Sequence, residues 1–145
     1  MIGRLFAPER DSRLTSFALL VLRLWLGLAM LINHGMPKIT KFGNSKESFP
    51  DPLGIGSPAS LALAIFAEAV CSLLLISGLL TRFAALTLAV LTGVAFGVVH
   101  GFSLSGESSG ELAFIYMAGY VVLLIAGPGW YSPDQRLFGP RGPAA

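Results

Sequence analysis

The sequence predicts an all-α membrane protein, a transmembrane four-helix bundle, and two observations lead to this prediction. Of the 145 residues, 54% are hydrophobic and only 12% are charged. The mean hydropathy is +0.72, which is too apolar for a water-soluble domain. The apolar residues also gather into four long stretches, at residues 14–33, 59–80, 83–102 and 112–127. The other residues are too few for a second domain, so we predict one membrane domain over residues 1–145.

The four stretches have about the length that a membrane-spanning helix needs. About 20 residues at about 1.5 Å each cross the roughly 30 Å hydrocarbon core of a bilayer. The fourth stretch reaches this length only with flanking residues, so we expect its helix over 110–127. Pro37 after the first stretch, Pro58 before the second and Pro128 after the fourth mark helix ends, because proline interrupts helical hydrogen bonding.

The basic residues predict the orientation in the membrane. One side would hold Arg4, Arg10, Arg13, Arg82, Arg136 and Arg141, and the other side would hold Lys38, Lys41 and Lys46. Because cytoplasmic loops are enriched in Lys and Arg, we expect both termini in the cytoplasm and an up-down-up-down path. We expect a multi-pass protein of a bacterial-type cytoplasmic (inner) membrane. The basic residues form no continuous run, which excludes nucleic acid as a partner.

Two charged residues, Arg23 and Glu68, fall inside predicted spans. Each lies nine residues from the start of its stretch, and the two stretches start on opposite sides of the membrane. At about 1.5 Å per residue both should therefore reach the midplane. An unpaired charge at that depth costs at least ~2.5–3.5 kcal/mol, so we predict an ion pair between them. This pair would either fix the fold or contact a substrate, a proton or a quinone headgroup.

Helical spacing extends the predicted pair into two stripes that should face the interior. The stripe on the first helix consists of Arg23, Gly27, Met30 and His34. The stripe on the second helix consists of Glu68, Cys71, Ser72 and Leu75. Residues at these intervals share one helix face, so each stripe would carry its charge into the bundle.

A second polar group is expected at the outer ends of the helices, where His34, Lys38, His100 and Glu111 would come near one another. Such a cluster could bind a metal, move protons or hold the carbonyl of a quinone, or simply contact headgroup water. Haem ligation by the two histidines is disfavoured, because a haem at the rim would lie half outside the bundle. The single cysteine, Cys71, excludes a multi-cysteine metal cage, and we predict no metal site.

Three glycines, Gly93, Gly97 and Gly101, recur at every fourth position of the third stretch. This small-xxx-small pattern allows helix backbones to approach closely. The close contact could lie inside the bundle or between two copies of the chain, so the pattern leaves a homodimer open.

Three ordered segments of the chain resemble the DoxX family of membrane proteins. The first is the succession Arg23, Gly27, His34, Gly35, Pro37 and Lys38. The second is Glu68, a leucine run, and then Gly78, Leu79, Leu80, Thr81 and Arg82. The third is Gly127, Pro128, Gly129, Trp130, Tyr131, Ser132, Pro133 and Asp134. The resemblance covers roughly residues 14–137 and implies a four-helix membrane bundle. The residues that match its shared pattern are Arg23, His34, Lys38, Glu68 and Asp134.

The resemblance also implies a function. The family includes the membrane subunit of a thiosulfate:quinone oxidoreductase, and members proposed to hold soluble redox-defence enzymes at the membrane. We therefore expect a quinone-linked, redox-associated subunit with a soluble redox partner. Its catalytic residues would be Arg23, Glu68 and His34, and Lys38 and His100 would also bind the quinone. The alternatives are a non-catalytic anchor or assembly factor, whose outer loop at residues 36–57 binds a partner, and a small-solute transporter.

Overall fold

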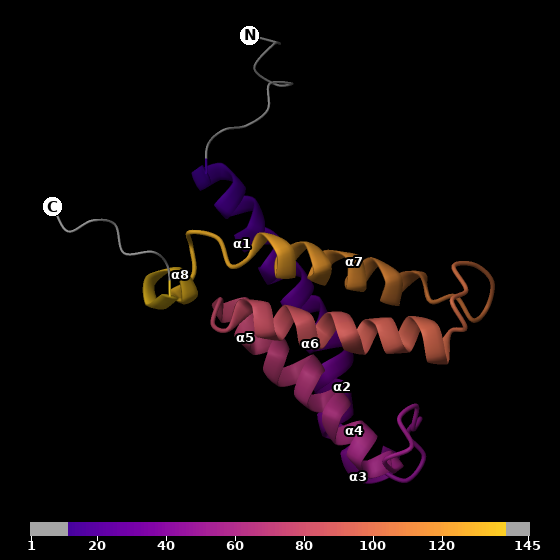
Figure 1. Cartoon of the computed structure of the whole chain (residues 1–145). Helices are drawn as coiled ribbons and strands as arrows, with labels where there is room; N and C mark the ends of the chain where they lie inside the picture. Colours follow the sequence, from indigo (N-terminus) through magenta and orange to yellow (C-terminus); the bar gives the residue numbers. More distant parts are fainter. Residues whose placement is uncertain (1–11, 139–145) are drawn as a thin grey trace, which may run out of the picture.

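The computed structural model describes residues 12–138, and every regular element in this range is helical (Figure 1). The elements are α1 (Ser12–Met30), η2 (Leu31–Gly35), α2 (Met36–Thr40), α3 (Phe42–Ser45), α4 (Ser57–Ile65), η3 (Phe66–Cys71), α5 (Ser72–Ser77), α6 (Thr81–Val94), η4 (Ala95–Val99), α7 (Glu111–Ala126) and α8 (Pro133–Phe138). The η segments are π-helical turns that continue the neighbouring α-helices. The all-α prediction is confirmed for the described residues.

Three continuous helices are long and apolar enough to cross a membrane: Arg13–Thr40, Ser57–Ser77 and Thr81–Val99. The fourth apolar helix, α7, has 16 residues, or about 24 Å at about 1.5 Å per residue. The second and third spans begin and end within about three residues of the predicted stretches. The chain therefore has three full-length spans and a shorter fourth apolar helix in its described part.

The first helix runs well past its predicted end at residue 33, through Pro37 to Thr40. The π-helical turn η2 makes this continuation possible. The backbone N–H of Met36 donates to the carbonyl of Leu31, one residue further back than in an α-helix, and Pro37 then falls in the first turn of α2. Proline is tolerated there because its missing N–H has no helical partner to lose. Reading Pro37 as a helix end was therefore wrong.

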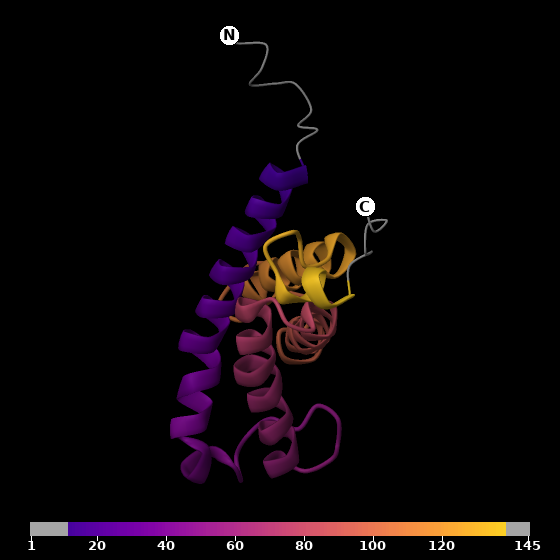
Figure 2. The same cartoon turned by 90° about the vertical axis from the view of Figure 1, so that its left-hand side faces the viewer.

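The helices form two antiparallel hairpins that cross steeply. The first hairpin joins α1–α2 to α4–α5, and the second joins α6 to α7 (Figure 1). In Figure 2 the first hairpin runs along the vertical while α6 is seen almost end-on. Consecutive helices are antiparallel within each hairpin, as expected, but the predicted bundle of four near-parallel helices is not confirmed.

The interior faces follow the predicted stripes. On α1, Arg23, Gly27 and Met30 are buried, whereas Trp25 between them is 75% exposed and faces outward. On the second span, the predicted stripe is buried as a whole, at Glu68, Cys71, Ser72 and Leu75. Around these residues, a core cluster includes leucines, alanines and two tyrosines of α6 and α7. The outward apolar side chains then face the position of the lipid.

Glycines let the first two helices approach to backbone contact. A Cβ on Gly35 would lie 2.8 Å from the carbonyl oxygen of Glu68, and one on Gly27 would lie 2.6 Å from Cγ1 of Ile76. Both distances are shorter than real Cβ contacts. Gly35 faces backbone and therefore requires glycine, whereas a larger residue at Gly27 would have to displace the side chain of Ile76. These two glycines also define the register of the hairpin, in which residue 35 lies opposite residue 68.

The glycines of the third stretch do not share one open face. A Cβ on Gly93 would lie 3.3 Å from Sδ of Met117 on α7, and the ring of Phe102 covers Gly97. Gly101 has a φ of +57° and belongs to the turn after η4. Gly93 thus serves packing within the chain, and a homodimer through these glycines remains a prediction.

The two described ends of the chain lie at the same end of the molecule. A Cβ on Gly129, after α7, would lie 3.3 Å from the carbonyl oxygen of Ser16, near the start of α1. This contact places the segment after α7 beside the start of α1, while the side of the membrane on which the termini lie stays a prediction. Arg4, Arg10 and Arg141, which contributed to that charge count, lie outside the described residues.

Candidate functional site

Arg23 and Glu68 do not form the predicted ion pair. In the observed register Glu68 lies opposite Gly35, and the side chain of Arg23 lies against Gly78. The prediction failed because it ended the first helix at residue 33. Since the helix continues to Thr40, the chain turns back later, and Arg23 and Glu68 come to lie at different depths. They belong to two separate polar sites.

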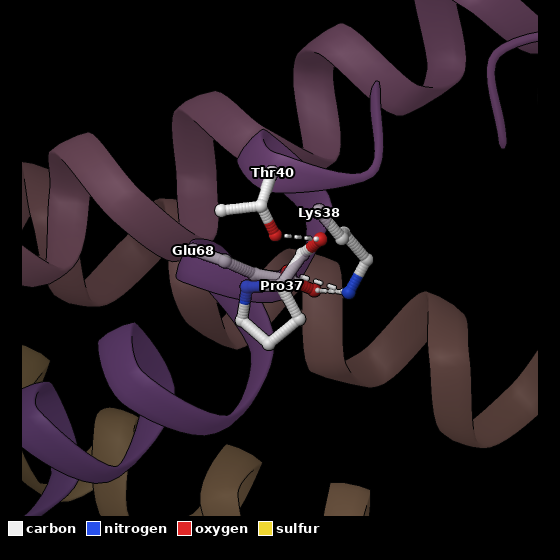
Figure 3. A network of polar contacts seen from close by, with 4 residues as sticks. All are labelled: Pro37, Lys38, Thr40 and Glu68. Atoms are coloured by element: carbon white, nitrogen blue, oxygen red, sulfur yellow. Dashed lines mark hydrogen bonds and ion pairs between the residues drawn. The ribbon is translucent and has the colours of Figure 1, made fainter. Parts of the chain in front are cut away.

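The carboxylate of Glu68 pairs instead with Lys38. Nζ of Lys38 lies 2.6 Å from Oε2 and 2.9 Å from Oε1 of Glu68, as Figure 3 shows. The side chain of Glu68 is 9% exposed and that of Lys38 is 24% exposed. An ammonium group has three N–H donors, so one donor of Lys38 remains for another acceptor.

This ion pair borders a cavity of about 430 Å³, the outer cavity. Its walls come from α1, η2, α2, α4, η3, α6, η4 and α7, and from the loops before α4 and before α7. Its polar lining residues are His34, Lys38, Ser60, Glu68, Thr92, His100, Ser109 and Tyr116, and all its other lining residues are apolar. A cavity of this size with apolar walls and a few convergent polar groups is typical of small-molecule sites.

All three π-helical turns contribute to the outer cavity. His34 lies in η2, Glu68 lies in η3, and Ala95 and Val99 of η4 also line the wall. A π-helical turn inserts one residue into an α-helix and is frequent at functional sites. In each of these helices, the inserted residue rotates the part of the helix after it, so that different side chains face the interior there.

The ring of His34 is held by aromatic contact. It packs edge-on against Tyr116 at a centroid distance of 5.9 Å, and Tyr116 stacks on Tyr120 at 6.0 Å. The hydroxyl of Tyr120 donates to the carbonyl of Leu26 over 3.4 Å. Within the described part of the chain neither ring nitrogen of His34 makes a hydrogen bond, so both are available to a molecule in the cavity.

His100 lies on the wall formed by η4 and the loop before α7. Its Nδ1 is 3.1 Å from the carbonyl oxygen of Ser108. Gly110 packs so closely that a Cβ there would lie 2.7 Å from Cβ of His100. The position of the imidazole is therefore fixed by the loop. Glu111, the fourth member of the predicted outer cluster, is exposed and does not line the cavity.

The loop that covers the outer cavity is tied down by Asp51. Its carboxylate accepts hydrogen bonds from the hydroxyl of Ser60 over 2.6 Å and from the N–H groups of Gly56 and Ile55 over 2.8 and 3.1 Å. These donors, led by Ser60, lower the pKa of Asp51 because they stabilise the charged form. Neighbouring Pro50 and Pro52 line the cavity.

Arg23 belongs to a second polar site, the inner network, with Gly78, Tyr131 and Asp134. Its side chain is fully buried, and its Nη2 donates to the carbonyl of Tyr131 over 2.8 Å. Nε and Nη1 have no hydrogen-bond partner among the described residues. A Cβ on Gly78 would overlap the guanidinium, so glycine is required there. Arg23 does not line the outer cavity.

Asp134 anchors the C-terminal segment to the start of α6. Its carboxylate accepts the backbone N–H groups of Leu80 and Thr81, each over 2.7 Å. Leu80 has a φ of +48°, a conformation that non-glycine residues rarely adopt. Asp134 also lies close enough for its charge to act on Arg23. The inner network thus joins α1, the α5–α6 turn and α8.

Of the predicted site residues, the structure brings His34, Lys38, Glu68 and His100 to one cavity and leaves Arg23 out. Sequence reasoning missed Tyr116, which lines the same cavity. Its signal was a pair of tyrosines four residues apart, at 116 and 120, in an otherwise apolar stretch.

Comparison with known proteins identifies the family of the chain. The DoxX family model matches residues 18–101. The chain belongs to the DoxX family. An uncharacterised protein of Haemophilus influenzae is similar, at 32% identity over 101 residues, which is 66% of this chain and 66% of the relative. No solved structure matches the chain.

The family match covers much of the site of this DoxX protein. The matched residues include Arg23, His34, Lys38, Glu68 and His100. Tyr116 and Asp134 lie after the matched segment. Family membership and the apolar helices together identify a multi-pass membrane protein.

Proposed function

We propose that this DoxX protein is the quinone-binding membrane subunit of a redox system and that the outer cavity holds the quinone headgroup. One observation carries the proposal. A cavity of about 430 Å³ has mainly apolar walls and is bordered by the Lys38–Glu68 ion pair and by His34, whose ring nitrogens are unbonded in the described chain.

The lining residues fit the chemistry of a quinone. A quinone joins a flat ring with two carbonyl acceptors to an apolar tail, so its site needs a few donors and a long apolar wall. Lys38 and His34 can supply donors to a carbonyl oxygen. Leu63 and Leu112, which line the cavity, are 51% and 57% exposed, and they offer an apolar rim for a tail that extends into lipid.

The residues of the chain would hold the headgroup and move protons. A bound quinone accepts two electrons and two protons, and the electrons would come from a soluble redox partner. The unused N–H of Lys38 would hold one carbonyl oxygen, and Glu68 would hold or release a proton beside it. Lys38 keeps the Glu68 carboxylate oriented through both oxygens. Arg23, buried in the inner network, is left out of the proposed quinone site.

The test is binding of decylubiquinone to the purified protein in lipid nanodiscs. His34→Ala should weaken binding by about tenfold, the effect of one lost hydrogen bond of about 1.4 kcal/mol. Glu68→Gln should also weaken binding, because Lys38 then loses the carboxylate that orients it. Glu111→Gln is the matched control, because Glu111 also lies at the outer end but does not line the cavity. Equal affinity in Glu68→Gln and Glu111→Gln would refute the proposal.

The expected location is the cytoplasmic (inner) membrane of a bacterium, with both termini inside. The bacterial relative and the excess of basic residues on the side of the termini support it. A cysteine introduced at Lys46, in the outer loop, should react with a membrane-impermeant maleimide added to intact cells, whereas one introduced at Arg136 should not.

A second candidate function is a docking platform for a soluble redox enzyme. The end of the first span and the segment after it expose apolar side chains beside basic ones. Ile39 and Phe42 are 45% and 37% exposed, and Lys41 and Lys46 are exposed between and after them. This function predicts that a partner copurifies with the protein and is lost when Ile39 and Phe42 become serine, with quinone binding unaffected.

A further inference from the structure

The contacts of His100 indicate which of its ring nitrogens donates a hydrogen bond and which accepts one. Nδ1 lies 3.1 Å from the carbonyl oxygen of Ser108, and a carbonyl oxygen only accepts hydrogen bonds. Nδ1 therefore carries the proton of the neutral ring, and Nε2 carries a lone pair. Within the described residues Nε2 has no hydrogen-bond partner. Because His100 lines the outer cavity, this wall presents an acceptor.

The surrounding loop holds this ring in place. The N–H of Gly110 donates to the carbonyl of Ser103 over 2.7 Å, and the N–H of Ser103 donates to the carbonyl of His100 over 3.0 Å. These bonds close the loop that carries Ser108. A Cβ on Gly110 would lie 2.7 Å from both Cβ of His100 and Cδ2 of Phe96, so the ring has no room to shift toward Gly110.

We propose that His100 makes the outer cavity selective for the hydroxyl form of its ligand, a quinol, over the oxidised quinone. This inference rests on the proposed quinone site. A quinol hydroxyl can donate to Nε2 of His100, whereas a quinone carbonyl would place a second acceptor against that lone pair. Lys38, which only donates, accepts either form, because hydroxyl and carbonyl oxygens both accept hydrogen bonds. Both oxygens of Glu68 already accept from Lys38, and His34, with both ring nitrogens unbonded in the described chain, can donate to a carbonyl or accept from a hydroxyl. Nε2 of His100, set as an acceptor by the contact with Ser108, is then the group that distinguishes the two forms.

The test compares affinities for decylubiquinol, kept reduced under anaerobic conditions, and decylubiquinone in nanodiscs. The wild-type protein should bind the quinol about tenfold more tightly, the value of one hydrogen bond. His100→Asn places an amide N–H where Nδ1 was, so it can keep the bond to Ser108, but it removes Nε2. This variant should lose the preference, with quinol affinity falling about tenfold and quinone affinity changing less than about twofold.

Two further variants keep the result interpretable. Gly110→Ala retains the imidazole of His100 but displaces it, so it should also reduce the preference for the quinol. It replaces His100→Asn in the test if that variant does not fold. His34→Asn, as the matched control, should leave the ratio of the two affinities unchanged. A wild-type ratio near one, or equal losses for both ligands in His100→Asn, would overturn the inference and leave the quinone site standing. If neither ligand binds the wild-type protein, the proposed function fails and this inference fails with it.

Discussion

The outer cavity and the inner network both contain buried charges, but they satisfy them differently. In the inner network, Asp134 accepts two backbone N–H groups and Arg23 donates to a backbone carbonyl. At the outer cavity, Lys38 and Glu68 satisfy one another and face an open volume of about 430 Å³. Fifteen residues separate Arg23 from Lys38 on one continuous helix, or roughly 22 Å at about 1.5 Å per residue.

This difference separates charges that stabilise the fold from charges that remain available to a ligand. The inner network joins elements far apart in sequence through backbone atoms, which every residue type supplies. Both sites have unused groups, Nε and Nη1 of Arg23 in the inner network and groups of Lys38, His34 and His100 at the outer cavity, but only the latter residues line the cavity. Changes to the inner network should therefore reduce stability without changing the affinity of the folded protein, and changes at the outer cavity should also reduce that affinity.

The largest effect is expected from Asp134→Ala. The substitution leaves the N–H groups of Leu80 and Thr81 without their acceptor and removes the anion nearest to Arg23. We expect a loss of about 3 kcal/mol in the free energy of unfolding, since each hydrogen bond to a charged group contributes about 1.5–3 kcal/mol. Unfolding in mixed micelles with increasing SDS measures it.

Two controls accompany this change. Asp134→Asn retains one acceptor oxygen and should lose about half as much. Gln135→Ala alters the next side chain and should change stability by less than about 0.5 kcal/mol. Decylubiquinone affinity, measured on the folded fraction, should not change in any of them. A stability for Asp134→Ala equal to that of Gln135→Ala would remove the distinction between the two sites.

The next effect comes from exchanging the charges of the outer ion pair. Lys38→Met alone leaves the carboxylate of Glu68, 9% exposed, without its cation, and should cost about 2 kcal/mol of stability. The double variant Lys38→Glu, Glu68→Lys restores a pair and should recover most of that loss. It should not recover quinone affinity, because the ammonium group then projects from a different helix. If the double variant recovered both stability and quinone affinity, the role of the ion pair would be to stabilise the fold, as in the inner network.

How much of the fold could be predicted depends on whether a feature is local. The four apolar stretches and the two interior stripes follow from composition and spacing, so the sequence predicts them well. The continuation of the first helix through Pro37 does not, because it depends on the π-helical turn η2. The steep crossing of the hairpins depends on which faces of α6 and α7 fit against the first hairpin, and no local pattern specifies that fit.

The same reasoning applies to the sites. His34, Lys38 and His100 could be placed together because their depths follow from their distances to the helix ends, whereas the same argument put Glu68 at the midplane. The partner of Glu68 was predicted incorrectly, since a shift in hairpin register changes which residues face each other. Asp134 was noted only through the family resemblance. Its contact with Leu80 and Thr81 spans more than fifty residues of sequence, and neither charge nor spacing indicates it.

A smaller effect on the outer cavity is expected from Gly35→Ala. The added Cβ would lie 2.8 Å from the carbonyl oxygen of Glu68, so the two helices must separate at the point where Lys38 reaches Glu68. We expect a stability loss of about 1–2 kcal/mol, typical of overpacking, and weaker decylubiquinone binding. Gly43→Ala is the control, because no atom lies within 4 Å of its added Cβ. Equal behaviour of the two variants would contradict the observed register.

The smallest effect concerns the loop over the outer cavity and depends on pH. The pKa of Asp51 is lowered, chiefly by the hydroxyl of Ser60 and then by the N–H groups of Gly56 and Ile55. A carboxyl whose pKa is lower in the folded state stabilises that state above its unfolded pKa, about 3.8 to 3.9. The stabilisation is lost as the pH falls from there through the lowered folded value.

Hydrogen exchange measured by mass spectrometry after pulses at successive pH values tests this. Relative to the intrinsic exchange rate, the amides of Ile55 and Gly56 should lose protection as the pH falls below about 4 and through the lowered folded pKa of Asp51. In Asp51→Asn they should be less protected at neutral pH, with no further loss below pH 4. The amides of Leu80 and Thr81, held by Asp134 in the inner network, provide the internal comparison in the same sample. If the loop amides of Asp51→Asn are as protected at neutral pH as those of the wild-type protein, the carboxylate of Asp51 does not hold the loop over the cavity.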